Sequence, residues 1–176
     1  MLTCRSSFME TGIPEIGRLE LLSTDRGLAG ILFCDERRSR ASAGWRARNV
    51  RSAVPAAPGE HDGSARQIRE YLAGERREFT FPLHRIGTPF QRAVLDAVAS
   101  VPFGARVSYQ DIARAVGNPA ACRAVGAANG ANPLPLVIPC HRIVGASNKL
   151  TGYGGGLDAK RWLLSLESPA LLALAS

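Results

Sequence analysis

The chain has 176 residues, of which 45% are hydrophobic and 21% charged, a composition typical of a globular protein with one or two small domains. It excludes a disordered chain, a coiled coil and a collagen, and no apolar run is long enough to span a membrane. The formal net charge is +7, and of the 22 positive residues only Lys149 and Lys160 are lysine. Because arginine binds phosphate well, this balance favours a polyanionic partner; a solvated arginine-rich surface is an equal alternative.

The four cysteines, Cys4, Cys34, Cys122 and Cys140, form no CxxC pair and no tight Cys/His cluster. We therefore expect no structural zinc site. The N-terminal segment MLTCRSSFMETG lacks the apolar stretch of a signal peptide. These two features together predict a cytoplasmic protein with four free thiols.

The first half of the chain, residues 1–86, predicts a small α/β domain. Residues 17–23 alternate between apolar and polar, a turn signal follows, and residues 28–34 are again apolar, which predicts a β-hairpin. Residues 35–63 carry six arginines and two prolines with little periodicity. This segment therefore predicts a long arginine-rich loop or a poorly ordered connector.

Two further elements are expected before residue 87. Ser64 and Gln67 have the spacing of a capping box, and the apolar residues that follow predict a helix that stops at Gly74. Apolar residues then alternate over 79–83, which predicts another strand.

The second half, residues 87–176, predicts a mainly helical domain. The expected helix starts are Thr88-Pro89, Ser108 with Asp111, and Asn118-Pro119. The second and third helices, joined by a Gly-Asn turn, outline a helix-turn-helix. A last helix is expected over 158–168, with Trp162, Leu163 and Leu166 on its packing face.

The third helix, PAACRAVGAANG, carries alanines and glycines, with Arg123 as its only long charged residue. Major-groove recognition helices usually present long polar side chains to base edges. Small residues instead let a helix approach a shallow groove closely, while one arginine enters the base stack. An ordinary alanine-rich core helix with a solvated Arg123 is the competing interpretation.

Cys140 and His141 follow the stiff apolar segment NPLPLVIP. A nearby base or cation lowers the pKa of a thiol and makes it a candidate nucleophile. Glu167 could orient the histidine. Neighbouring side chains on an extended backbone point apart, so Cys140 and His141 can meet only through a turn or a water. A buried structural cysteine is the alternative.

The ordered motifs GTPFQ, SY, NP, RAVG, NP, PCHR and GYGGG resemble the O6-alkylguanine-DNA alkyltransferase family over residues 88–167. The first half fits more loosely, through ETGIPEIGRLELLSTDRGL and REYLAGE. The resemblance implies an α+β fold: a small N-terminal antiparallel-sheet domain over 1–86 and a winged helix-turn-helix-like catalytic domain over 87–176. It also implies a DNA repair protein that flips O6-alkylguanine out of duplex DNA and transfers the alkyl group irreversibly to its own cysteine. O6-methylguanine is the expected chief substrate and O4-alkylthymine a second one.

The resemblance also implies roles for individual residues. Cys140 would accept the alkyl group, His141 would act as its base through a water, and Glu167 would polarise His141. Tyr109 would turn the target phosphate and donate a proton toward guanine N3, and Arg123 would fill the gap left by the flipped nucleotide. Asn132 would brace the turn before the active site. The residues implied to contact DNA are Asn118, Ala124, Gly126 and Ala127, and those implied to line the pocket are Pro139, Ile143, Tyr153 and Gly154. In that pocket, the carbonyls of Cys140 and Ile143 would accept from the exocyclic amine of guanine.

No cofactor, metal or obligate protein partner is expected, and the partner is double-stranded DNA that contains the lesion. Some relatives bind zinc in the N-terminal part, but Cys4, Cys34 and His84 do not match that pattern. Leu95 and Gly154 replace a tryptophan and a serine of some relatives, and Cys122 is interpreted as a packing residue. Three alternatives remain: a lesion-binding protein without transfer activity, a helix-turn-helix regulator with Cys140 as redox sensor, and a cysteine hydrolase.

Overall fold

The computed structural model describes residues 1–35 and 39–168 and divides the chain into two compact units. Unit 1 covers Met1–Ile86, and unit 2 covers Gly87–Ser176, of which 169–176 lie outside the described residues. The expected α+β class is confirmed. Within the two described ranges, no helix has the length and apolar character needed to cross a membrane.

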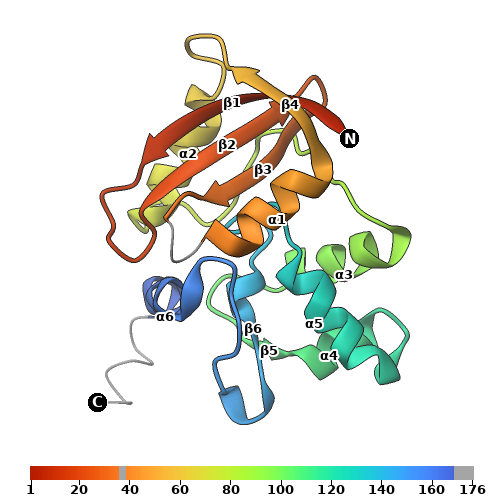
Figure 1. Ribbon diagram of the computed structural model, residues 1–176. Helices are drawn as coiled ribbons and strands as arrows, with labels where there is room; N and C mark the ends of the chain where they lie inside the picture. The colour runs from red at the N-terminus through yellow and green to blue at the C-terminus, as the bar shows by residue number, and fades with distance from the viewer. Residues whose placement is uncertain (36–38, 169–176) are drawn as a thin grey trace. The chain divides into compact units, whose positions relative to one another are not determined.

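Unit 1 is built on a four-stranded sheet with the order β3-β2-β1-β4 (Figure 1). The expected hairpin is confirmed, because β2 (Arg18–Thr24) and β3 (Gly27–Phe33) pair antiparallel. The sequence analysis missed β1 (Leu2–Glu10), which pairs antiparallel with β2 and parallel with β4 (Val50–Pro55). Among these strands only the β1–β4 pair is parallel.

The expectation of a long loop over 35–63 is wrong. Residues 36–38 lie outside the described residues, but helix α1 (Ser39–Asn49) and strand β4 fill most of the segment. Helix α1 is rich in arginine and has little amphipathic periodicity, so its sequence carries no helical pattern. Trp45 anchors it to the sheet by packing in a buried cluster with Leu22, and β4 is held by backbone pairing with β1.

Helix α2 (Asp62–Leu72) lies on the face of the sheet opposite α1 (Figure 1). It begins two residues before the predicted start, and the predicted capping box is wrong, because Ser64 Oγ donates to the His61 carbonyl at 2.9 Å. His61 fastens this helix end to the sheet. Its Nδ1 lies 2.6 Å from Ser7 Oγ, and its Nε2 lies 2.8 Å from Ser23 Oγ.

The strand predicted over 79–83 is also wrong, because this segment makes a single bridge, between Leu83 and Leu28 of β3. The Pro82 carbonyl accepts from the Leu28 amide at 2.9 Å, and the His84 amide donates to the Leu28 carbonyl at 2.8 Å. Proline has no N–H to donate, so the ladder does not extend through it.

Unit 2 contains a three-helix cluster in which both of the first two predicted caps are confirmed. Thr88 and Gln91 form a capping box, as do Ser108 and Asp111. Asn118 gives no side-chain cap, and the third helix starts with a 3-10 turn at Pro119 before it becomes α-helical. The helices are α3 (Pro89–Ala99), α4 (Tyr109–Ala115) and α5 (Cys122–Gly130), and they pack against one another.

A short parallel ladder connects this cluster to the remaining elements of unit 2. It pairs β5 (Val107–Ser108), which leads into α4, with β6 (Ile143–Val144). The 3-10 helix η2 (Cys140–Arg142) precedes β6, and a further 3-10 turn, η3 (Ala146–Asn148), follows it. Helix α6 (Gly156–Glu167) closes the unit. The ladder register therefore fixes the start of α4 relative to Cys140.

Candidate active site

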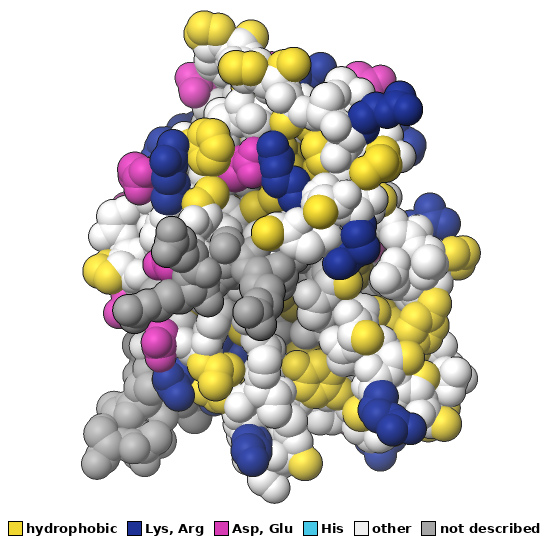
Figure 2. All heavy atoms as spheres, in the orientation of Figure 1, with side chains coloured by type: hydrophobic (Ala, Val, Ile, Leu, Met, Phe, Trp, Pro, Cys, Tyr) yellow, Lys and Arg dark blue, Asp and Glu magenta, His cyan; other side chains and the backbone are white. Residues whose placement is uncertain are grey.

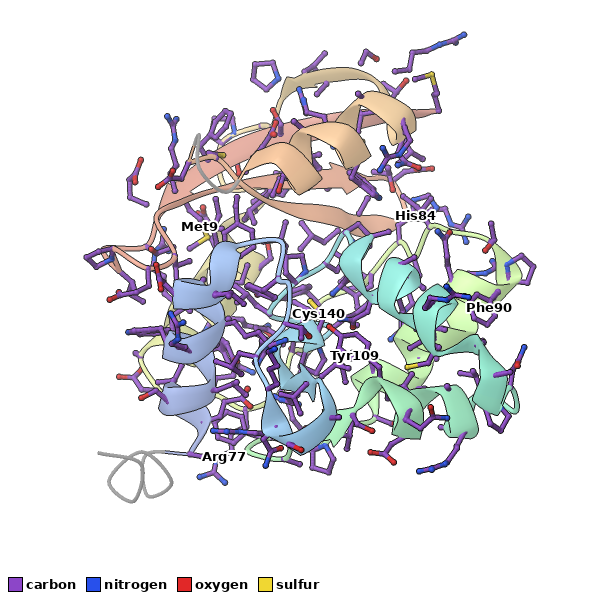
Figure 3. All side chains as sticks on the ribbon, turned by 60° about the horizontal axis from the view of Figure 1, so that its bottom comes forward. Met9, Arg77, His84, Phe90, Tyr109 and Cys140 are labelled. Carbon is purple, nitrogen blue, oxygen red and sulfur yellow. The ribbon has the colours of Figure 1, made fainter. Side chains whose placement is uncertain are left out.

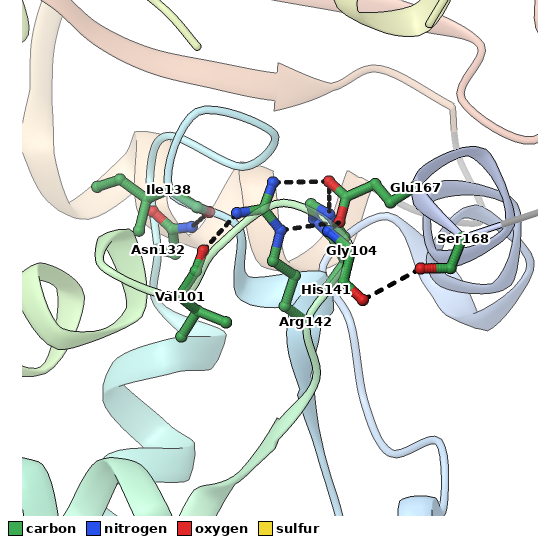
Figure 4. Close-up of polar contacts among 8 residues, drawn as sticks. All are labelled: Val101, Gly104, Asn132, Ile138, His141, Arg142, Glu167 and Ser168. Carbon is green, nitrogen blue, oxygen red and sulfur yellow. Dashed lines mark hydrogen bonds and ion pairs between the residues drawn. The ribbon is translucent and has the colours of Figure 1, made fainter. Parts of the chain in front are cut away.

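Cys140 follows α5 through a proline-rich loop that Asn132 holds in shape. The Asn132 Nδ2 donates to the Ile138 carbonyl at 2.8 Å, and its Oδ1 accepts from the Leu134 amide at 3.0 Å (Figure 4). Leu136 in this loop is buried and has φ 74°, a left-handed conformation that is rare for leucine. Such a conformation persists only where the surroundings enforce it, so the chain enters Cys140 in one defined conformation.

The Cys140 thiol is buried, with 4% of the residue exposed. Burial raises its pKa to about 11, although a hydrogen bond from Asn132, the positive charge of Lys160 and the amides of Cys140 and His141 all act to lower it. These groups all favour the thiolate, but burial outweighs them. The resting thiol is protonated at neutral pH, so its use as a nucleophile requires a group that takes the proton.

His141 and Arg142 both bind the Glu167 carboxylate in the interior of unit 2 (Figure 4). His141 Nε2 lies 3.0 Å from Oε1, while Arg142 Nη2 donates to Oε1 at 2.7 Å and its Nε to Oε2 at 2.8 Å. The Gly104 amide also donates to Oε2 at 3.2 Å, and Arg142 Nη1 donates to the Val101 carbonyl at 2.5 Å. Glu167 is thus held by bonds from three directions.

These contacts define the protonation state of His141. Burial lowers its pKa, and this effect exceeds the opposing influence of Glu167, so the ring is neutral at pH 7. A carboxylate only accepts hydrogen bonds, so the ring proton sits on Nε2 and Nδ1 is the basic nitrogen. His141 is therefore a neutral base whose orientation is set by Glu167.

Lys160 on α6 is fully buried beside the same site. Its Nζ donates to the Ile143 carbonyl at 2.6 Å and to the Thr151 carbonyl at 2.9 Å. Burial lowers its pKa to about 8, against the raising influence of Cys140. At neutral pH it is largely charged, and it favours the thiolate form of Cys140.

Tyr109 is the first residue of α4 and follows the β5–β6 ladder directly. Figure 3 shows Tyr109 and Cys140 in the part of unit 2 between α6 and the helices α4 and α5. The Tyr109 hydroxyl accepts from Thr151 Oγ1 at 3.4 Å. A Cβ added to Gly126 of α5 would lie 3.9 Å from the Tyr109 ring. Gly126 of α5 therefore lies beside the Tyr109 ring of α4.

Most of the residues expected to contact DNA are exposed. Arg123 is exposed and, in the part of the chain that the structure describes, forms no ion pair. Hydrophobic and basic side chains are visible over α4 and α5 in Figure 2. Of the other predicted contacts, Asn118, Ala124 and Ala127 are exposed, and Gly126 is half-buried.

The predicted pocket residues lie on both sides of Cys140. Pro139 and Ile143 are buried, whereas Tyr153 and Gly154 are half-buried. The Tyr153 ring stands edge-on to His141, with ring centroids 6.3 Å apart. Among residues 1–35 and 39–168, no group of three His, Cys, Asp or Glu side chains is close enough together to hold a metal ion.

Sequence reasoning missed two charged residues of this site, Arg142 and Lys160. The signal for Lys160 was its position, because it shares a helix face with Leu163, Leu164 and Glu167 and all four are buried. Arg142 carried no comparable periodic signal, since it lies in a three-residue turn.

Two family models cover most of the chain. The 6-O-methylguanine DNA methyltransferase ribonuclease-like domain matches residues 14–84, and the DNA-binding domain of the same family matches residues 89–169. Both the sheet unit and the helical unit are thus part of one family pattern.

Individual relatives agree with these models. The chain is 44% identical to a methylated-DNA–protein-cysteine methyltransferase of Mycolicibacterium paratuberculosis, over 90% of this chain and 93% of that protein. A protein of the same name from Mycobacterium leprae is 39% identical over 98% of this chain and 96% of its own length. The crystal structure of Mycobacterium tuberculosis OGT in complex with DNA matches with a TM-score of 0.76 and 37% identity, over 99% of this chain and 100% of that one. The chain therefore belongs to the 6-O-methylguanine DNA methyltransferase family.

Proposed function

We propose that this protein repairs DNA by transferring the alkyl group of O6-alkylguanine to Cys140, in a single irreversible turnover. The observation that carries the proposal is the set of contacts around one buried thiol. Cys140 adjoins a neutral histidine that Glu167 orients, and Asn132 and Lys160 stabilise its anion. Both the alkyl donor and its acceptor are then present, so the reaction needs no cofactor.

The chemical step balances within these groups. The Cys140 proton passes through a water to His141 Nδ1, and the sulfur attacks the alkyl carbon. A carbon–sulfur bond forms as the carbon–O6 bond breaks, and the electron pair stays on guanine. Tyr109 donates a proton toward N3, so the base leaves neutral, and the Tyr109 proton is replaced from the His141 imidazolium through solvent. A thioether has no easy return path, so each molecule reacts once.

The O6 position points into the duplex, so the base must leave the stack before it can reach a buried thiol. The exposed face of α5 suits this task, because its small residues allow close approach to a groove and Arg123 projects from it. We assign Arg123 to the space vacated by the flipped nucleotide, while Ala124, Ala127 and Asn118 contact the backbone and groove. Affinity should fall steeply with salt, with a slope of roughly −0.9 per phosphate neutralised.

Guanine is selected in the pocket around Cys140. We assign the Tyr153 side chain, the Gly154 amide and Pro139 to the walls near O6. The carbonyls of Cys140 and Ile143 accept from the exocyclic amine. O4-alkylthymine has no such amine, so it should react more slowly than O6-methylguanine.

The test is intact mass spectrometry after incubation with a duplex oligonucleotide that contains one O6-methylguanine. We expect an increase of one methyl mass on one molecule of protein per lesion, mapped to Cys140. Cys140→Ser should bind the same duplex and gain no mass, and Cys122→Ser, which alters a half-buried thiol on α5, should react like the wild type. Methylation of Cys140→Ser would refute the assignment, and repeated turnover on an ester or amide would instead indicate a cysteine hydrolase.

A further inference from the structure

Asn129 on α5 buries an amide oxygen for which the described part of the chain supplies no partner. The residue is 5% exposed, and its Oδ1 has no hydrogen-bond partner. Native proteins pair nearly all buried polar atoms, because an unpaired one loses its bonds to water without replacement. A leucine of similar size would avoid this cost, so packing alone does not explain an asparagine here.

The position of Asn129 on α5 directs its side chain toward the substrate region. It lies one turn after Gly126, and residues three apart share a helix face. Gly126 lies beside the Tyr109 ring, because a Cβ added to it would be 3.9 Å from ring carbons of Tyr109. Side chains on a helix lean toward its N-terminus, so the Asn129 amide leans back toward Gly126 and Tyr109.

Toward the other end of α5, Asn129 is followed after one further turn by Asn132, which hydrogen-bonds the Cys140 sulfur. Along the chain, Asn129 thus lies between Gly126, which adjoins Tyr109, the residue assigned to guanine N3, and Asn132, which bonds the thiol assigned to the alkyl group on O6. Along the guanine edge, the atoms between O6 and N3 are N1 and the exocyclic amine. Alkylation at O6 removes the proton from N1, so the amine is the only donor on this stretch.

We infer that Asn129 Oδ1 accepts a hydrogen bond from the exocyclic amine of the flipped guanine and is a specificity-determining residue. The inference rests on the proposed function and adds an acceptor to it. The Ile143 carbonyl already accepts from Lys160, and the Cys140 carbonyl already accepts from the Ile143 amide. The Asn129 oxygen brings two uncommitted lone pairs, and the amine has two hydrogens to donate.

The experiment compares two bases that differ only in this amine. Single-turnover methyl transfer to Cys140 is measured on one oligonucleotide carrying O6-methylguanine and on the same oligonucleotide carrying O6-methylhypoxanthine, with wild type and Asn129→Leu. We expect Asn129→Leu to slow the guanine reaction by about 10- to 100-fold and to leave the hypoxanthine reaction within about twofold. Differences in base pairing cancel, because both proteins meet the same two oligonucleotides.

Thermal unfolding shows whether the variant is folded, and Asn129→Ala provides the same comparison with a smaller side chain. Asn129→Leu should melt no lower than the wild type, because it replaces an unpaired amide with an apolar group of similar volume. Equal slowing on both bases, or no slowing on either, would overturn the inference and leave the proposed function standing. Failure of the wild type to methylate Cys140 with either base would remove the proposed function, and this inference with it.

Discussion

Glu167 has two separable tasks, and the substitution Glu167→Gln tests both. Its carboxylate neutralises the buried guanidinium of Arg142 and orients His141. Glutamine keeps the shape and one acceptor oxygen but loses the charge, so Arg142 is left as a buried cation without its counter-ion. Removing one partner of a buried ion pair costs roughly 3–5 kcal/mol, a large share of the roughly 5–15 kcal/mol that stabilises a typical domain.

The double variant Glu167→Gln with Arg142→Met separates stability from chemistry. Methionine removes the unpaired charge, so we expect the double variant to recover about 2–3 kcal/mol relative to Glu167→Gln alone. It should not recover activity, because His141 still lacks a carboxylate, and methyl transfer should stay at least about tenfold below wild type.

Urea unfolding followed by circular dichroism gives the stabilities, and the mass shift at Cys140 gives the rates. Additive stability losses in the double variant would refute the ion-pair argument, because independent groups do not couple. Wild-type transfer rates in either variant would refute the orienting role of Glu167.

Three further predictions follow from the geometry. Arg123→Ala should slow repair of duplex DNA far more than reaction with free O6-benzylguanine, because the free base needs no unstacking. The control Arg161→Ala removes the same charge from an exposed ion pair on α6 and should affect both reactions little. Equal losses of rate on the two substrates in Arg123→Ala would assign Arg123 to the pocket or the fold. Lys160→Met should raise the pKa of Cys140 further and shift the pH–rate profile of methyl transfer upward, and an unchanged profile would show that its charge does not act on the thiol. Burial lowers the pKa of all three histidines below the ordinary 6.5, so as the pH falls the unfolded chain binds protons at a higher pH than the folded chain does. The melting temperature should therefore fall between pH 7 and pH 5. A constant melting temperature would contradict the burial argument.

The elements that could be predicted from the sequence are those specified by neighbouring residues. The β2–β3 hairpin has a turn between two apolar runs, and α3 and α4 have capping boxes within four residues. By contrast, β1 is polar at Arg5, Ser6 and Ser7 and owes its place to pairing with strands on both sides. Backbone pairing of β1 with β4 and packing of α1 through Trp45 involve distant segments and leave no local pattern, so these three elements were not predicted.

In the candidate site, too, the residues marked by a local motif could be predicted, whereas those brought in by the packing of the unit could not. Cys140, His141 and Glu167 were named in advance because a motif marks them, and the structure brings His141 and Glu167 within 3.0 Å. Which groups set the protonation of the thiol could not be predicted, because burial depends on the packing of the whole unit. Arg142 and Lys160 are charged residues in the interior, where a sequence pattern alone leads the reader to expect apolar ones.

The bond between His141 and Glu167 joins residues 26 positions apart, so the ribosome makes the two residues at different times. A ribosome adds roughly 5–20 residues per second, so about 1–5 s pass between the synthesis of the histidine and that of its carboxylate. During this interval the nascent chain contains Cys140, His141 and Arg142 but not the group that neutralises one and orients another. Until α6 docks, a chain still being made carries the Cys140 thiol beside a histidine that no carboxylate orients. On the proposed function, the chain would become able to accept an alkyl group only when the last turn of α6 is in place.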